Sequence, residues 1–219
     1  MSPSETDGPA GLEDRILDAS LALIGRWGVA KTSLSDIAHE AKCGRATLYR
    51  AFPGGKEHLF RSLAHREITA VSRQVTAGLG AAQSLEDALV AGISESASFV
   101  VNHRGLQFIL AHEPGLVLPY LGFTQMDRLY RAASLFAGPH LVRFVDVELT
   151  PWAVEWVVRL VVSYLFNPAA GFDLTSEADA RRLVRSYLLP ALQPVQPPPV
   201  GPSATDAQST AFVPATIGS

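Results

Sequence analysis

The sequence predicts an all-α protein of two parts, a small N-terminal helix-turn-helix and a larger helical region behind it. Apolar side chains recur at helical spacing through most of residues 12–192. Strand signals are weak, because no turn flanked by alternating apolar runs is found. Residues 32–60 read as two short helices joined by a tight turn, followed by a Pro-Gly-Gly break.

Each helix is predicted from its apolar spacing and from the residues that end it. The first ends at Gly28, and Ser33 or Ser35 can cap the second, with Asp36 near its positive end. The predicted helices are Leu12–Trp27, Leu34–Ala41, Arg45–Ala51, Lys56–Ala77, Ser84–His103, Gly105–His112, Leu116–Ala137, Pro151–Asn167 and Ser176–Leu192.

Both ends of the chain are predicted to be disordered. Residues 1–10 are polar and acidic, with no sign of a signal peptide. Residues 193–219 are rich in proline and carry Asp206 as their only charged side chain, so they cannot bury enough apolar surface to fold.

The second helix of the pair carries side chains suited to DNA. Leu48 and Phe52 are predicted to face the core. The outward residues combine guanidinium, hydroxyl and phenol groups, which suit phosphates and base edges. They are Arg45, Ala46, Thr47, Tyr49 and Arg50.

The same stretch resembles the DNA-binding part of the tetracycline-repressor-like (TetR) family of transcription regulators. The resemblance lies in the aromatic–Gly pair Trp27-Gly28, in the run SDIAHEAKCGRATLYRAF and in the following KEHLF, and it covers about residues 12–65. It implies a DNA-binding domain over 11–56, a linker helix continuing to about 78, and a helical ligand-binding and dimerisation domain over 79–192.

The sequence departs from the family pattern at two places. The family turn usually reads Ala-Gly-Val-Ser, whereas this turn is Ala41-Lys42-Cys43-Gly44. Lys42 then stands where glycine commonly takes a left-handed backbone, at a cost of about 1 kcal/mol. One extra residue also lies between Phe52 and Lys56, which affects where Lys56 lies against DNA.

Other residues near the turn are expected to hold the DNA backbone. Hydroxyls and free N–H groups at the start of a helix can bind a phosphate, and lysines can do so without reading sequence. The candidates are Thr32, Ser33, Lys42 and Lys56.

The charge distribution agrees with a DNA-binding N-terminal part. The net charge is −3, but residues 26–73 hold nine Lys or Arg against four Asp or Glu, and residues 74–219 hold eight against twelve. The single cysteine permits no intrachain disulfide and favours the cytoplasm. No membrane span, metal site, cofactor site or catalytic constellation is predicted.

The region behind the helix-turn-helix contains two helices that are apolar on more than one face, around 152–166 and from 176. Such helices are buried either in a core or between subunits. The resemblance implies a homodimer in which the last two long helices pair with their partners. The interface candidates are Trp152, Glu155, Val158, Arg159, Val162, Leu183, Tyr187 and Leu188.

The other helices of this region are expected to surround a cavity for a small ligand. Such cavities are lined by apolar and aromatic side chains with a few polar groups, although the same pattern is typical of plain core. The candidates are Phe99, Phe108, His112, Met126, Leu129, Tyr130 and Trp156.

Together these features predict a sequence-specific transcription regulator rather than an enzyme. The favoured interpretation is a homodimeric repressor that binds a near-palindromic operator and leaves it when a small apolar or amphipathic ligand binds. A DNA-binding protein that responds to no ligand and a helical module that binds an acidic protein remain alternatives.

Overall fold

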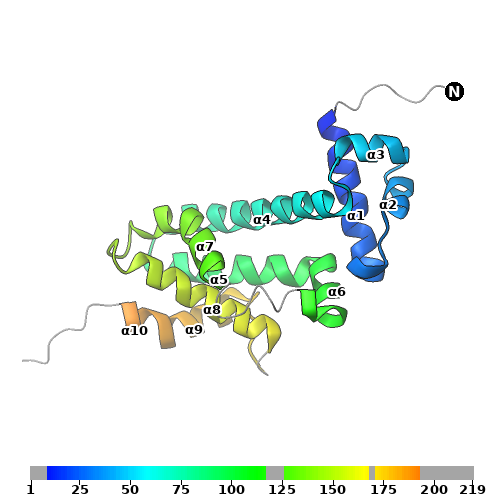
Figure 1. The fold of residues 1–219 in the computed structure, drawn as a ribbon. Helices are drawn as coiled ribbons and strands as arrows, with labels where there is room; N and C mark the ends of the chain where they lie inside the picture. Colours follow the sequence, from blue (N-terminus) through cyan, green and yellow to red (C-terminus); the bar gives the residue numbers. More distant parts are fainter. Residues whose placement is uncertain (1–8, 117–125, 168–170, 193–219) are drawn as a thin grey trace, which may run out of the picture.

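The computed structural model describes residues 9–116, 126–167 and 171–192, and these residues form helices and no strand (Figure 1). The predictions of disorder for 1–10 and 193–219 fall almost wholly outside the described residues. The helices are α1 (Pro9–Lys31), α2 (Leu34–Glu40), α3 (Arg45–Ala51), α4 (Gly55–Ala81), α5 (Leu85–Asn102), α6 (Arg104–His112), α7 (Met126–Leu141), α8 (Thr150–Phe166), α9 (Glu177–Leu183) and α10 (Leu189–Leu192).

The predicted helices are present, with differences in detail. α1 begins at Pro9 rather than Leu12 and continues past Gly28 to Lys31. α7 begins at Met126 and continues through Pro139, so the predicted start at Leu116 is wrong; Pro114–Leu116 forms a 3-10 turn and residues 117–125 lie outside the described residues. α4 extends to Ala81. The predicted last helix contains a π-helical turn, Val184–Leu188, which ends two residues before Pro190, whose ring and missing N–H disturb regular α-helical bonding.

Residues 9–63, called the head below, form one end of the molecule. α1, α2 and α3 pack around a shared core with the start of α4, and Ile16, Leu23, Ile37, Leu48 and Leu59 are all fully buried in it. α4 then runs from the head along the rest of the molecule (Figure 1). The head is therefore joined to the remainder through one long helix that belongs to both.

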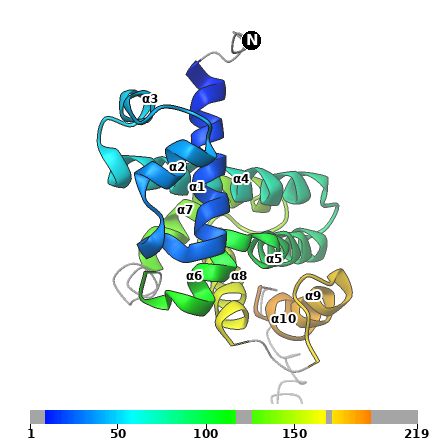
Figure 2. The same ribbon diagram turned by 90° about the vertical axis from the view of Figure 1, so that its right-hand side faces the viewer.

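Residues 64–192, called the body, contain two further cores. α5, α8, α9 and the following turns enclose Leu89, Ile93, Leu183 and Val184. α4, α7 and α8 enclose a second cluster around Leu79. Figure 2, a quarter turn from Figure 1, shows α6 lying beside the lower end of α1. None of the described helices is long and apolar enough to cross a membrane.

A break in α1 at Gly28 creates the contact between head and body. Gly28 has a φ of 83° and a ψ of 171°, and a short helical turn follows it to Lys31. The Glu113 carboxylate, at the end of α6, accepts the N–H groups of Val29 at 2.8 Å and Ala30 at 3.2 Å. These N–H groups would otherwise be unpaired donors at the start of a helical turn.

Only glycine fits at this break. A Cβ on residue 28 would lie 2.7 Å from both Glu113 Oε1 and Phe108 Cε1, and its φ and ψ lie in a region populated almost only by glycine. The contact made by Gly28, Val29, Ala30, Phe108 and Glu113 is called the α1–α6 clasp.

We expect Gly28→Ala to destabilise the protein through this clasp. Backbone strain and the displacement of Glu113 and Phe108 should together lower the free energy of unfolding by about 2 kcal/mol or more. Urea unfolding followed by circular dichroism measures this. Gly115→Ala is the matched control, because a Cβ there meets nothing within 4 Å. Equal stability of the two variants would contradict the clasp.

Candidate nucleic-acid interface

The turn between α2 and α3 has the backbone that the sequence predicted. Lys42 takes a left-handed conformation, with a φ of 52°, and Gly44 caps α3 in an extended conformation without a side-chain bond. The Cys43 N–H donates to the Ala38 carbonyl at 2.9 Å and fixes the angle between the helices. Burial raises the pKa of the Cys43 thiol, which suits a packed apolar side chain rather than a reactive one.

The start of α2 is fixed by a capping box. The Ser33 hydroxyl accepts the Asp36 N–H at 3.2 Å, and the Asp36 carboxylate accepts the Ser33 N–H at 3.2 Å. The Ser33 hydroxyl also donates to the Asp36 carboxylate, and this bond, together with the one from the Ser33 N–H, holds the pKa of the Asp36 carboxyl below its usual range. Of the two serines predicted to cap α2, the structure selects Ser33. An ion pair of 2.6 Å between Arg26 and Glu40 also joins α1 to α2.

α3 is anchored on one face and open on the other. Leu48 is 1% exposed and Phe52, its C-cap, is 2% exposed, so both hold the helix to the core as predicted. The opposite face leaves Arg45, Ala46, Tyr49 and Arg50 exposed, with Thr47 half-buried beside them. Arg50 donates to the Thr47 hydroxyl at 3.3 Å. The outward set predicted for base and phosphate contact thus shares one surface.

Two of the expected phosphate contacts do not lie on that surface. Thr32 is 1% exposed, and its hydroxyl donates to the Gly28 carbonyl at 2.7 Å, where it closes the end of α1. The Lys56 ammonium donates to the Val29 carbonyl at 2.9 Å and lies over the Phe60 ring. Both side chains are held within the protein because the break at Gly28 frees carbonyls that need donors. Ser33 and Lys42 remain exposed.

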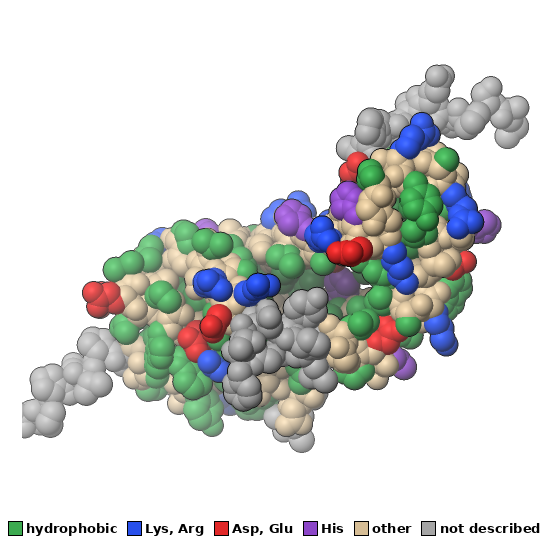
Figure 3. Space-filling view, in the orientation of Figure 1, with side chains coloured by type: hydrophobic (Ala, Val, Ile, Leu, Met, Phe, Trp, Pro, Cys, Tyr) green, Lys and Arg blue, Asp and Glu red, His purple; other side chains and the backbone are tan. Residues whose placement is uncertain are grey.

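Figure 3 shows several Lys and Arg side chains distributed over the visible face of the head. This agrees with the charge difference between residues 26–73 and 74–219. A basic surface around α3 favours contact with phosphates, and the outward side chains of α3 lie within that surface.

The residues expected to line a ligand cavity in the body do not share one cavity. Phe108 and His112 stack on each other along α6, with ring centroids 4.4 Å apart. Tyr130 is buried under the Arg159 guanidinium, and Trp156 packs on Trp152 at the surface. Leu129 is exposed and Met126 is half-buried at the start of α7. Helical spacing placed these side chains on helices, but it did not determine how the helices are rotated.

Phe99 is the exception, because it lines two spaces where the head meets the body. An apolar cavity of about 410 Å³, open to solvent, lies between α1, α4, α5 and α6, and a groove of about 640 Å³ with a more polar lining adjoins it. The interior of the body between α4, α5, α7 and α8 holds only about 50 Å³. The remaining lining residues and Glu113 were not predicted, since no local pattern in the sequence relates α1 to α6.

The expected dimer residues fall into three groups, which are buried, half-buried and exposed. Leu183 and Leu188 are buried in the protomer's own core, so their prediction as interface residues is wrong. Val158 and Val162 are half-buried, and Val158 packs against the core around α7. The exposed members are Trp152, Arg159 and Tyr187, and Glu155 accepts a bond of 2.6 Å from Arg159.

Within the described ranges, no three His, Cys, Asp or Glu side chains gather as a group that could hold a metal ion. The site that the structure does present is a turn-linked helix pair with a capped first helix and an exposed, basic second helix. This arrangement defines a helix-turn-helix protein that binds DNA.

Comparison with known proteins identifies the family. Residues 16–63 match the family model described as bacterial regulatory proteins, tetR family. An uncharacterised HTH-type transcriptional regulator of Mycobacterium tuberculosis is 28% identical over 183 residues, which are 83% of this chain and 85% of that protein. The HTH-type transcriptional regulator BetI of Brucella suis is 25% identical over 181 residues, 79% of this chain and 87% of its own length.

Solved structures share the fold over most of the chain. The TetR family repressor AlkX of Dietzia sp. has a TM-score of 0.57 at 17% identity, over 85% of this chain and 100% of that one. The fatty acid degradation regulator FadR of Bacillus halodurans has a TM-score of 0.58 at 18% identity, over 82% of this chain and 96% of that one. The chain is a TetR-family transcriptional regulator that binds DNA.

Proposed function

We propose that this regulator is a homodimeric repressor, acting in the cytoplasm, that binds a near-palindromic operator and is released from it by a small apolar or amphipathic ligand. The proposal assigns DNA binding to residues 11–56, the link to α4 as far as about residue 78, and ligand binding and dimerisation to residues 79–192. The observation that carries it is the exposed face of α3, anchored by Leu48 and Phe52.

The geometry of α3 supports sequence reading by its first residues. Arg45 and Thr47 lie near the N-terminus of the helix, where helix-turn-helix proteins contact base edges. Arg45 is exposed and has no ion-pair partner among the described residues, so its guanidinium is available to a guanine or a phosphate. Tyr49 and Arg50, further along, are suited to the DNA backbone, as are Ser33 and Lys42.

The surface of α8 supports dimerisation. Trp152 and Trp156 are each 41% exposed and pack edge to face, with ring centroids 5.8 Å apart. Tyr187, in the π-helical turn, is 69% exposed. Large aromatic side chains on a surface are typical of protein interfaces. An isologous interface, formed by the same surface of both protomers, would let the two heads contact the two half-sites of an operator.

The α1–α6 clasp supports control of the heads by the body. It joins α6 to the segment that leads directly into α2, so a displacement of α6 acts on the start of the helix-turn-helix. A ligand releases the operator only if it binds the non-binding arrangement more tightly than the binding one.

We expect Arg45→Ala to weaken binding to the operator more than binding to unrelated duplex DNA. The loss of a bidentate contact to a base should reduce specific affinity by about tenfold or more. Fluorescence anisotropy with both DNAs, at one fixed salt concentration, measures the ratio. Arg128→Ala is the control, because Arg128 is exposed on α7 in the body. An equal loss of affinity for both DNAs would indicate that Arg45 contacts only the DNA backbone.

Trp156→Glu should convert the dimer to a folded monomer. A carboxylate in place of a large exposed aromatic side chain opposes burial in an interface and leaves the protomer core intact. Sedimentation velocity measures the change, and circular dichroism confirms the fold. Val147→Glu, at a residue 71% exposed between α7 and α8, is the matched control. A Trp156→Glu profile identical to that of the unaltered protein argues against α8 as the interface.

A further inference from the structure

We propose that the effector of this regulator is an amphipathic acid, whose apolar part lies in the cavity between head and body and whose anionic group lies beside Arg104. This proposal rests on the proposed function, because it names the site and chemical class of the ligand that would release the operator. It also moves the site from the body, where the sequence predicted it, to the junction of α1, α4, α5 and α6.

The cavity at the junction has the size and chemistry of a ligand site. Its volume of about 410 Å³ is within the range of small-molecule pockets, and far larger than the 50 Å³ inside the body. Figure 3 shows the surface hollowed where the head meets the body. Most of its lining side chains are apolar, from Leu21 and Ile24 on α1, Leu63 on α4, Phe99 and Val100 on α5 and Leu106 on α6.

The polar groups in the cavity wall are already paired. The Leu106 N–H donates to His103 Nδ1 at 2.9 Å, so the Nε2 proton of the ring faces Glu67, whose Oε2 lies 3.2 Å away. Arg66 binds the other Glu67 oxygen at 3.1 Å and Asp18 of α1 at 2.7 Å. A polar ligand group would have to break these bonds, and this cavity therefore favours an apolar group.

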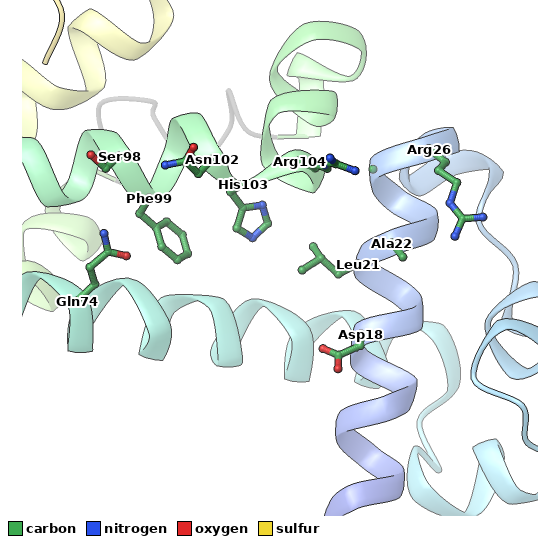
Figure 4. Close-up of a pocket in the computed structure, with 11 residues that line it drawn as sticks. Asp18, Leu21, Ala22, Arg26, Gln74, Ser98, Phe99, Asn102, His103 and Arg104 are labelled. Atoms are coloured by element: carbon green, nitrogen blue, oxygen red, sulfur yellow. The ribbon is translucent and has the colours of Figure 1, made fainter. Parts of the chain in front are cut away.

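The adjoining groove gives the ligand its polar end. Figure 4 shows Leu21, Phe99 and His103 projecting into the space between α1, α4 and α5, and these three side chains line both the cavity and the groove. A molecule can therefore extend from one space into the other. Two of the other groove residues are not available to a ligand charge, because Asp18 pairs with Arg66 and Arg26 pairs with Glu40.

Arg104 is the charge that the groove leaves uncompensated. It is exposed at the start of α6, and its side chain is directed toward α1 (Figure 4). It has no hydrogen-bond or ion-pair partner among the described residues. Gln74, also in the groove, donates to Glu95 at 2.8 Å, which leaves Arg104 as the cation for an acidic ligand group.

A ligand in this position would contact the head and the body at once. Leu21 and Ile24 belong to α1, and Leu106 and Ile109 belong to α6, so occupancy acts on the two helices that the α1–α6 clasp joins. Gly105 now allows α6 to approach α1 closely, since a Cβ there would lie 2.7 Å from Leu21 Cδ1. A molecule entering between them would favour a different spacing of α1 and α6.

Calorimetry with the purified full-length protein, without DNA, tests the site with dodecanoate and dodecanol as probes. We expect dodecanoate to bind. Arg104→Gln should lower the affinity for dodecanoate by about three- to tenfold and leave the affinity for dodecanol little changed. Arg128→Gln, which removes an exposed arginine of α7, should change neither the affinity for dodecanoate nor that for dodecanol. Val100→Trp should weaken both probes by at least tenfold, because the indole fills the cavity.

Ala64→Trp is a second blocking variant, at an exposed position of the lining where the fold should tolerate a large side chain. Unchanged dodecanoate binding in this folded variant overturns the site, as does the absence of dodecanoate binding to an unaltered protein that still binds its operator. Equal effects of Arg104→Gln on both probes overturn the acidic ligand class. If dodecanoate binds and the variants change its affinity as expected, the ligand site is supported. If bound dodecanoate then fails to dissociate the protein from its operator, that result contradicts ligand-driven release of the operator but not the site.

Discussion

The hydrogen bonds from Val29 and Ala30 to the Glu113 carboxylate are the interaction on which the arrangement of head and body depends. They exist because α1 breaks at Gly28 and starts a new turn, whose first N–H groups need acceptors. The same break leaves carbonyl groups that Thr32 and Lys56 satisfy. One backbone conformation therefore sets the end of α1, the entry to α2, the start of α4 and the docking of α6.

This shared dependence gives a physical basis for regulation. The head has its own core and could keep its internal structure while its position relative to the body changes. The junction between them contains an apolar cavity of about 410 Å³ beside the clasp. Packed cores resist gradual deformation, whereas a poorly filled junction can adopt two arrangements that differ little in free energy. The affinity of a ligand for each arrangement then determines the balance between them.

The sequence predicted the local structure of the head well, since local chemistry determines it. The left-handed Lys42, the Ser33 cap and the inward Leu48 and Phe52 all follow from residues within a few positions of one another. Thr32 and Lys56 were misplaced because their partners are backbone carbonyls exposed by the Gly28 break, and Glu113 was missed because it lies 84 residues from Val29.

In the body the sequence predicted helices but not their faces. Leu183 and Leu188 have the apolar spacing of an interface helix, yet the same spacing serves the protomer's own core, where the structure places them. The aromatic residues expected in one cavity are dispersed because each helix is rotated by packing against distant neighbours, such as Tyr130 beneath Arg159. Tertiary contacts of this kind produce no pattern among neighbouring residues of a sequence, so they are not predicted from it.

Selection of the purified protein against random duplex DNA, at near-physiological salt, tests the central claim most directly. A dimer with two α3 helices in successive major grooves should enrich a near-palindrome whose half-sites lie about 10 base pairs, or a multiple of this, apart. Salt-sensitive retention of DNA with no enriched sequence would contradict the account, because α3 would then contact phosphates without reading bases.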